Sequence, residues 1–167
     1  LAAMKAQMDK ATFGYRLHDA DAAANKLLAL AGRSEVRDFV DVLHLHDSYL
    51  TLGALAWAAS GKDPGYTPAF LLDQAARHTA YVQDDLDRLA LRAPLDLRVL
   101  KTRWISALEN AQVLVELLPP EEVGCLYLDG EQLPVTPDPK SQEFSSLTRH
   151  VGSVRGAWPT VSPDGLR

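Results

Sequence analysis

The stretch DLRVLKTRWISALENAQVLVELL, residues 96–118, decides the fold class of this chain. Apolar residues recur in it at steps of three and four, the spacing that keeps one face of an α-helix against a core. They are Leu97, Leu100, Trp104, Leu108, Ala111, Val115 and Leu118. Asp96 can cap the first turn, and Pro119 and Pro120 end the helix because proline lacks the backbone donor. We expect a long helix that serves as the spine of the domain.

Shorter helical patterns precede this spine. Residues Ala22 to Gly32 form one, which Asp19 or Asp21 can cap. Further helices are predicted over 34–60, with a bend, 67–78 and 84–91. The chain is rich in Ala and Leu, and aromatic residues make up 7% of it, which favours packed helices and excludes an all-β architecture.

A small β element is predicted after the spine. Residues 123–128 and 132–135 flank Asp129-Gly130, a pair typical of a tight hairpin turn because both central positions need positive φ. From there the chain is rich in Pro, Ser, Asp and Gly, with one helical turn predicted around 144–150. The predicted fold is therefore mainly α, a helical bundle-like domain with a small C-terminal β-hairpin.

The same patterns divide the chain into three parts. Residues 1–18 form an N-terminal segment, with a strand predicted over 12–18 because apolar and polar side chains alternate there. Residues 19–118 form the helical domain. Residues 119–167 carry the hairpin and a tail that we expect to wrap around the domain.

Charge and composition limit the classes of partner. A net charge of −5 gives no general attraction to nucleic-acid phosphate or to an anionic membrane, although a local basic site stays open. No apolar run approaches the roughly 20 residues that cross a bilayer, so no membrane association is expected. The single cysteine, Cys125, cannot form an internal disulfide, which fits a cytoplasmic protein. An acidic chain suits a protein partner or a second copy of itself better than nucleic acid.

Four charged residues form the main candidate site. Lys26 and Arg33 lie seven residues apart, which is two helical turns, and Asp38 and Asp41 share a face of the following helix. Adjacent helices could bring all four together. Such a group can hold a phosphate through the lysine, while a carboxylate takes Mg²⁺ or accepts a proton from an attacking hydroxyl. The alternative is an ion network that fixes the helix pair.

Two motifs in this region resemble those of a known family. The run LHDADAAANKLLAL, residues 17–30, is followed by Arg33 and then by RDFVD, residues 37–41. These stretches resemble two motifs of the AbiEii/AbiGii-type nucleotidyltransferases, Lys-Leu-x-Ala-Leu-x-x-Arg and Arg/Lys-Asp-x-x-Asp. The family is DNA-polymerase-β-like, and many of its members are toxins of toxin–antitoxin systems.

The resemblance implies roles for five residues. Lys26 would contact nucleotide phosphate, and Asp38 or Asp41 would be the catalytic or structural carboxylate. Arg33 and Arg37 would support them in substrate binding. If the metal-binding half of the family's fold is supplied by another segment or chain, a nucleoside triphosphate and Mg²⁺ are the implied substrate and cofactor, and the acceptor of the nucleotide could be RNA. Without that half, no cofactor is implied.

The chain departs from the family pattern in its metal-binding half. The family also has a Gly-Ser turn followed by Asp-x-Asp on a strand, which supplies the carboxylates of two-metal catalysis. In this chain the Gly-Ser pair is Gly152-Ser153, which comes long after the lysine motif in the sequence instead of before it. Asp19-Ala20-Asp21 and Asp85-Leu86-Asp87 lack the upstream turn, and we interpret them as helix caps or solvated charges. The chain therefore resembles a partial or catalytically incomplete nucleotidyltransferase. The alternative is a non-enzymatic helical module for protein interaction or oligomerisation.

No metal site is predicted at His44-Leu45-His46-Asp47, although it contains metal-ligating residue types. On a regular helix His44 and His46 point about 200° apart and cannot grip one ion. We expect Asp41 and His44, one turn apart, to form a side-chain hydrogen bond instead.

Overall fold

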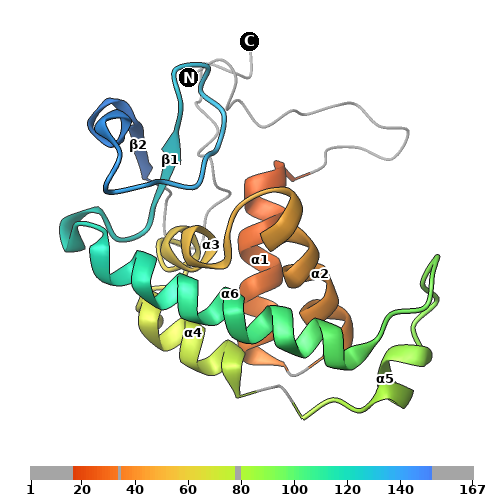
Figure 1. Ribbon diagram of the computed structural model, residues 1–167. Coiled ribbons are helices and arrows are strands. Elements are labelled where there is room, and N and C mark those ends of the chain that lie inside the picture. The colour runs from red at the N-terminus through yellow and green to blue at the C-terminus, as the bar shows by residue number, and fades with distance from the viewer. Residues whose placement is uncertain (1–16, 34, 78–79, 152–167) are drawn as a thin grey trace.

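The computed structural model describes residues 17–33, 35–77 and 80–151. They form a mainly helical domain with a two-stranded antiparallel sheet at one end (Figure 1), which confirms the predicted fold class. The strand predicted over 12–18 lies outside these residues except for Leu17 and His18, which precede the first helix. Within the described ranges no helix has the length and apolar character needed to span a membrane.

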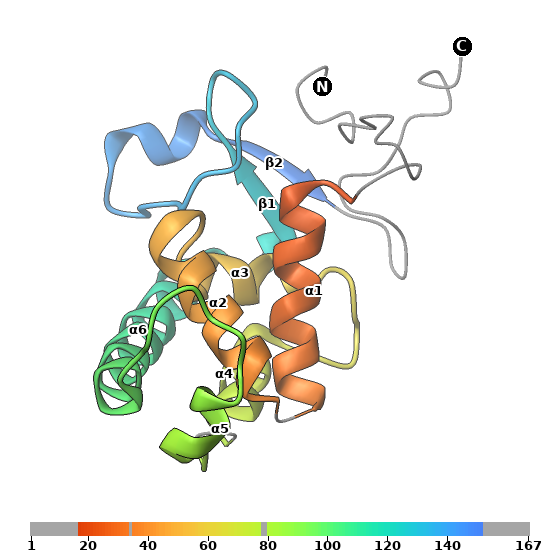
Figure 2. The same ribbon diagram turned by 90° about the vertical axis from the view of Figure 1, so that its right-hand side faces the viewer.

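The predicted spine is helix α6 (Leu97–Leu117), which runs along one side of the molecule (Figures 1 and 2). Asp96 caps it as predicted, because its carboxylate accepts a hydrogen bond from the backbone N–H of Arg98 at 2.8 Å. Trp104 on its inner side is completely buried and meets the ring of Phe39 edge-on, with 5.3 Å between ring centroids. The core of the domain lies on this inner side.

Helix α3 (Leu52–Ala59) lies at the centre of the domain, and all of its residues are buried. It packs directly on α6. A Cβ atom placed on Gly53 would lie 3.0 Å from the Cα of Ala111. Glycine is therefore what lets these two helix backbones approach so closely.

The bent helix predicted upstream is instead two separate helices, α3 and α2 (Val36–Ser48). Between them the backbone N–H groups find side-chain acceptors. The Nδ1 atom of His46 accepts from the N–H of Leu52 at 2.9 Å, and the hydroxyl of Thr136 accepts from the N–H of Thr51 at 3.0 Å. These bonds satisfy donors at the start of α3 that would otherwise lack partners, so the chain breaks rather than bends.

Helix α1 (Asp19–Gly32) lies beside α2 and packs on α3 (Figure 2). Its cap is His18, whose Nδ1 atom accepts from the N–H of Ala20 at 3.2 Å, rather than the predicted Asp19 or Asp21. One face of the helix enters the core with small and apolar side chains. They are Ala20, Ala23, Ala24, Leu27, Leu30 and Ala31.

Two further helices complete the helical layer. Helix α4 (Pro68–Ala76) begins as predicted, since the hydroxyl of Thr67 accepts from the N–H of Phe70 at 3.2 Å. Helix α5 (Gln83–Asp87) is shorter than the predicted 84–91. Both lie on the side of the domain opposite the sheet (Figure 1).

The sheet pairs strand β1 (Cys125–Leu128) with strand β2 (Thr148–Val151). The prediction that 132–135 forms the second strand was wrong, because in the described chain this segment makes one isolated bridge to β1, through Pro134. Proline has no backbone donor, so the segment cannot extend a ladder of hydrogen bonds. The helical turn predicted around 144–150 lies earlier in the structure, as the short 3₁₀ helix η2 (Gln142–Ser146), and residues 148–150 belong to β2 instead.

The loop after β1 is wider than the predicted two-residue turn. The positive φ, 64°, falls on Gln132 rather than on Gly130. The Asp129 carboxylate holds the loop by accepting from the N–H groups of Glu131 and Leu133, each at 2.9 Å. An aspartate that bonds its own loop in this way is a common turn former.

The sheet packs against the helical part through a second apolar cluster. Trp57, Leu118, Cys125 and Tyr127 form it, and all four are buried. The indole N–H of Trp57 donates to the carbonyl of Glu122 at 2.8 Å, in the 3₁₀ helix η1 (Pro120–Glu122). Burial raises the pKa of the Cys125 thiol to about 11, which leaves it protonated near neutral pH. The cysteine therefore acts as a small apolar side chain.

Candidate functional site

The four predicted charged residues come from two successive helices that lie side by side. Lys26 stands in the second half of α1, and Arg33 directly follows the end of that helix. Asp38 lies in the first turn of α2, where the helix dipole favours a carboxylate, and Asp41 follows one turn later. The two helices pack against each other, so that Asp38 meets Lys26 and Arg33 while Asp41 meets Lys26.

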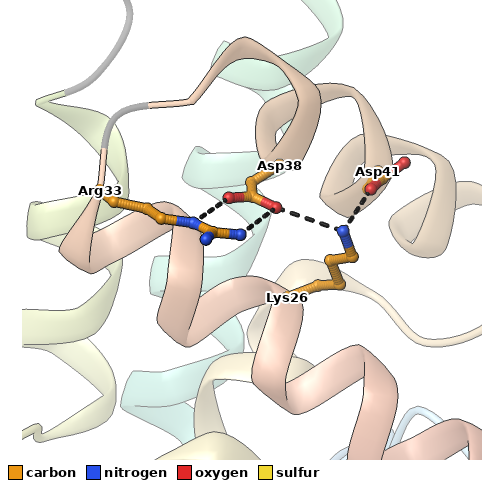
Figure 3. A network of polar contacts seen from close by, with 4 residues as sticks. All are labelled: Lys26, Arg33, Asp38 and Asp41. Carbon is orange, nitrogen blue, oxygen red and sulfur yellow. Dashed lines mark hydrogen bonds and ion pairs between the residues drawn. The ribbon is translucent and has the colours of Figure 1, made fainter.

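These four side chains form one continuous network (Figure 3). The ammonium group of Lys26 lies 2.7 Å from the Oδ2 atom of Asp41 and 3.3 Å from the Oδ1 atom of Asp38. The Nε atom of Arg33 donates to the Oδ2 atom of Asp38 at 2.9 Å. The structure thus confirms that the cations and carboxylates of the two motifs meet.

Burial separates the roles of the two carboxylates. The side chain of Asp38 is 1% exposed, whereas that of Asp41 is 41% exposed. Lys26, at 37%, also reaches solvent. A buried carboxylate needs paired cations to offset its lost hydration, and Asp38 has two of them, Lys26 and Arg33. Asp38 is therefore held in place, while Asp41 is accessible.

The electrostatics of the network stabilise the charged form of both cations. The hydrogen bond to Asp41 is the largest cause that raises the pKa of Lys26 above 10.5; burial opposes it, and Asp38 adds to it. The pKa of Arg33 is raised by its hydrogen bond to Asp38. Both side chains stay protonated throughout the physiological range, so the network holds two positive and two negative charges.

An open groove of 420 Å³ lies beside this network, between α1 and α2. Lys26 and Asp41 stand at its edge, with Asp19, His44 and Tyr49 along the rest of it. Alanine side chains of α1 also line it, which leaves room for a ligand. Size alone makes it a candidate binding site, since small-molecule pockets commonly reach about 300–1,000 Å³.

The tyrosine that lines the groove carries a buried polar atom. The hydroxyl oxygen of Tyr49 is buried and has no hydrogen-bond partner among the residues described. Burial raises the pKa of this phenol, and the negative charge of Asp19 adds to the effect. The hydroxyl therefore remains a neutral donor at the edge of the groove.

Arg37 lies apart from the network, and one predicted contact at the site is not made. Arg37 is exposed and contributes no ion pair to the network within the described ranges, unlike the other four predicted site residues. The hydrogen bond predicted between Asp41 and His44 is replaced by the bond from Lys26 to Asp41. His44 instead lines the groove, and His46 caps α3.

A second charged cluster on α1 was missed by sequence reasoning. The ammonium group of Lys62 lies 2.5 Å from the Asp21 carboxylate and 2.7 Å from the Asn25 amide oxygen. Asp21 is 2% exposed, so its interpretation as a helix cap or a solvated charge was wrong. No local pattern could reveal this pair, because 41 residues separate its partners. It fixes the loop after α3 against α1, on the side away from α2.

The described residues do not assemble a metal site by themselves. Across these ranges no group of three or more His, Cys, Asp or Glu side chains could hold a metal ion. The carboxylates of the network are already paired with cations. We therefore assign no metal ligand to them.

Comparisons of the chain with protein-family models, with curated proteins and with solved structures found no significant match. The family resemblance therefore rests on the two motifs, at 26–33 and 37–41. The structure shows where the residues of these two motifs lie. Four of the five lie in one network beside a groove.

Proposed function

We propose that this domain is the helical half of an AbiEii-like nucleotidyltransferase, in which Lys26 binds the phosphates of a nucleoside triphosphate. The observation that carries the proposal is the place of the ammonium group. The Lys26 side chain is partly exposed, and it lines the groove between the two helices that bear the motifs. The reaction would transfer the nucleotide from the triphosphate to an acceptor hydroxyl, which loses its proton, with pyrophosphate as the leaving group. We place this reaction in the cytoplasm, since the single cysteine cannot form an internal disulfide.

Phosphate binding requires Lys26 to exchange its partner Asp41. The exchange costs little, because ion pairs between exposed side chains contribute about 0–1 kcal/mol. A triphosphate carries several negative charges and accepts short, charge-assisted hydrogen bonds from an ammonium group. Lys26 therefore moves from the Asp41 carboxylate to a phosphate oxygen when the ligand enters.

Asp38 is a positioning residue in this proposal. Its carboxylate is buried and holds Lys26 and Arg33 at once, so it keeps the lysine directed along the groove during the exchange. Asp41 is the carboxylate with access to substrate, and it is released when Lys26 changes partner. It can then accept a hydrogen bond from the acceptor or the ligand. We place the metal-binding carboxylates of the reaction outside the described residues.

One observation favours a second candidate function, a non-enzymatic helical module that binds a protein partner or a second copy. The network is neutral, with two cations and two carboxylates that satisfy one another. Such a network can serve to fix α1 against α2 without binding any ligand. The two functions differ in one measurable respect, the response of the protein to nucleotide.

Thermal unfolding with each of the four common ribonucleoside triphosphates and Mg²⁺ tests the proposal. At a ligand concentration ten times Kd, binding stabilises the folded state by about 1.4 kcal/mol, which raises Tm by roughly 3–6 °C in a chain of this size. We expect this shift in the wild type and its loss in Lys26→Ala. Lys140→Ala, an exposed lysine away from the groove, is the matched control and keeps the shift.

A second variant separates binding from stability. Asp41→Asn removes the carboxylate that competes with phosphate, so it should bind inorganic triphosphate without metal more tightly than the wild type. Isothermal titration of both proteins measures this difference. The nucleotide proposal is contradicted if no triphosphate shifts the Tm of the wild type, or if Lys26→Ala shows the same shift. The non-enzymatic helical module is then the function that is left.

A further inference from the structure

Helix α2 has a second pocket on the side that faces away from α1. The helix lies between α1 and α6 and packs against both (Figure 2). The groove that Lys26 lines is on the α1 side. A pocket of 230 Å³, which we call the α6 pocket, is on the other side, where Leu95, Leu100 and Arg103 face α2. Asp41 and His44 line both the groove and the α6 pocket.

The order of residues around α2 explains this sharing. Successive residues of an α-helix are turned by about 100° around its axis. The α2 residues that line only the α6 pocket are Val40, Leu43 and Asp47, and those that line only the groove are Leu45 and Tyr49. Asp41 and His44 are one turn apart and lie between these two sets. They form a ridge, and ligands bound on its two sides would meet there.

The lining of the α6 pocket suits a neutral ligand that carries hydroxyl groups. The charged groups are two carboxylates, of Asp41 and Asp47, and the guanidinium of Arg103, which sum to one negative charge and therefore disfavour a phosphate. Arg103 pairs with the Oδ2 atom of Asp47, and in the described ranges the Oδ1 atom is left to accept from a hydroxyl. The rest of the lining is apolar and can pack on the carbon atoms of a sugar: Val40, Leu43, Leu95 and Leu100.

We propose that the α6 pocket holds the acceptor of the nucleotide, and that this acceptor is a sugar with two neighbouring hydroxyl groups, such as a ribose. The assignment rests on the proposed function, which places the triphosphate in the groove on the other side of the ridge. Pockets for whole cofactors commonly reach about 300–1,000 Å³, so 230 Å³ suits a single sugar ring.

The positions of the hydroxyl acceptors fit such a sugar. His44 and Asp47 are one turn apart on α2, so one small ligand can contact both. Asp47 accepts from one hydroxyl, as acidic side chains do from ribose in dinucleotide-binding folds. The neighbouring hydroxyl then lies at the ridge, where His44 or the Asp41 carboxylate released by Lys26 accepts its hydrogen bond. This is the hydroxyl that faces the triphosphate.

A nuclear magnetic resonance titration of the chain with adenosine tests the assignment. Adenosine should shift the ring signals of His44 and the Nε signal of Arg103, with a Kd in the millimolar range. The same titration with 2′,3′-dideoxyadenosine, which lacks both hydroxyl groups, should show binding at least about tenfold weaker, because hydrogen bonds to charged groups are lost.

Two aspartate variants tie the result to this pocket. Asp47→Ala should weaken adenosine binding about tenfold. Asp73→Ala is the matched control, since Asp73 is also an exposed aspartate paired with an arginine, Arg77, but lies on α4; it should bind adenosine like the wild type. Thermal unfolding checks that both variants fold. Adenosine binding that persists in Asp47→Ala, or that leaves the Arg103 signal unchanged, overturns the proposal.

A titration with both ligands separates this inference from the proposed function. Adenosine should bind equally well when inorganic triphosphate saturates the groove, whereas competition between them would place adenosine in the groove and overturn the proposal. Binding of triphosphate without any binding of adenosine leaves the proposed function and overturns only the acceptor site. Binding of adenosine without any binding of triphosphate overturns both.

An RNA trinucleotide with a free 3′ ribose identifies the source of the two hydroxyl groups. Tighter binding than adenosine at His44 and Arg103 supports the 3′ end of RNA as the acceptor. Weaker binding at the same residues supports a free nucleoside or sugar.

Discussion

Replacing Asp38 with asparagine should destabilise this domain several times more than the same replacement at Asp41. Both carboxylates bond the ammonium group of Lys26, and both substitutions preserve side-chain shape. The difference lies in burial and in the number of partners. Asp38 is 1% exposed and also binds Arg33, whereas Asp41 is 41% exposed and has Lys26 as its ion-pair partner in the described chain.

The size of each effect follows from these contacts. Hydrogen bonds to charged groups contribute about 1.5–3 kcal/mol, and the partly exposed cations around Asp38 place its loss near the lower end. The first turn of α2 also loses a carboxylate that favours the helix dipole, about 0.5 kcal/mol. We expect a loss of about 2–3 kcal/mol for Asp38→Asn and about 0–1 kcal/mol for Asp41→Asn.

Urea unfolding at pH 7 measures both values directly. A loss of 2–3 kcal/mol corresponds to a decrease in Tm of roughly 4–12 °C for a chain of this length. Two results would refute the reasoning. One is a stability of Asp38→Asn within about 0.5 kcal/mol of the wild type, the ordinary scatter of surface substitutions. The other is an equal loss at Asp41, which would mean that burial does not distinguish the two carboxylates.

Three further predictions follow from particular contacts. Gly53→Ala should destabilise the domain by about 1–3 kcal/mol, because the added Cβ would lie 3.0 Å from the backbone of Ala111. This overpacking outweighs the gain in helix propensity, which is about 1 kcal/mol. Chemical denaturation shows whether the free energy of unfolding falls or rises. Tyr81→Phe should keep or raise Tm at pH 7, since the buried hydroxyl has no hydrogen-bond partner among the described residues, and a clear fall would show that a partner exists. Raising the pH past 10.5 should lower the free energy of unfolding of the wild type more than that of Lys26→Met. The pKa of Lys26 in the folded state is raised above 10.5, so the charged lysine contributes its full stability below pH 10.5. That contribution is lost as the pH rises through the folded-state pKa. The free energy of unfolding of both proteins is measured at several pH values from 9 to 11, and an equal decrease with pH in the two proteins would contradict this prediction.

Local patterns predicted the long helix well. The cap at Asp96, the apolar spacing and the two prolines all lie within or next to the helix itself, and α6 begins and ends within a residue of the prediction. The same holds for the start of α4 at Thr67. Signals that act over one or two turns can be recognised in a sequence because all the partners are neighbours.

Contacts between distant residues account for the errors in the predicted fold. The break before α3 depends on the hydroxyl of Thr136, which is 85 residues from its partner Thr51. Strand β1 pairs with β2 rather than with the nearer segment at 132–135, where Pro134 interrupts the hydrogen-bonding pattern. The proline could have been weighed from the sequence, whereas the pairing with β2 could not.

In the candidate site too, local features could be predicted from the sequence and features that depend on distant residues could not. The spacing of Lys26, Arg33, Asp38 and Asp41 on two successive helices was sufficient to predict that they meet. Their different burial was not predictable, because it depends on the packing of α2 against the rest of the domain. The pair of Asp21 and Lys62 had no local signal at all.

The most direct measurement follows the Lys26 ammonium group by nuclear magnetic resonance while inorganic triphosphate is added to the chain. Its ¹⁵Nζ signal, and scalar coupling across the hydrogen bonds, report which carboxylate accepts from it. We predict that the coupling to Asp41 is lost on addition of triphosphate while the coupling to Asp38 persists. A Lys26 signal that stays unchanged at millimolar triphosphate, with both carboxylates still bonded, would contradict the exchange and with it the proposed role in phosphate binding.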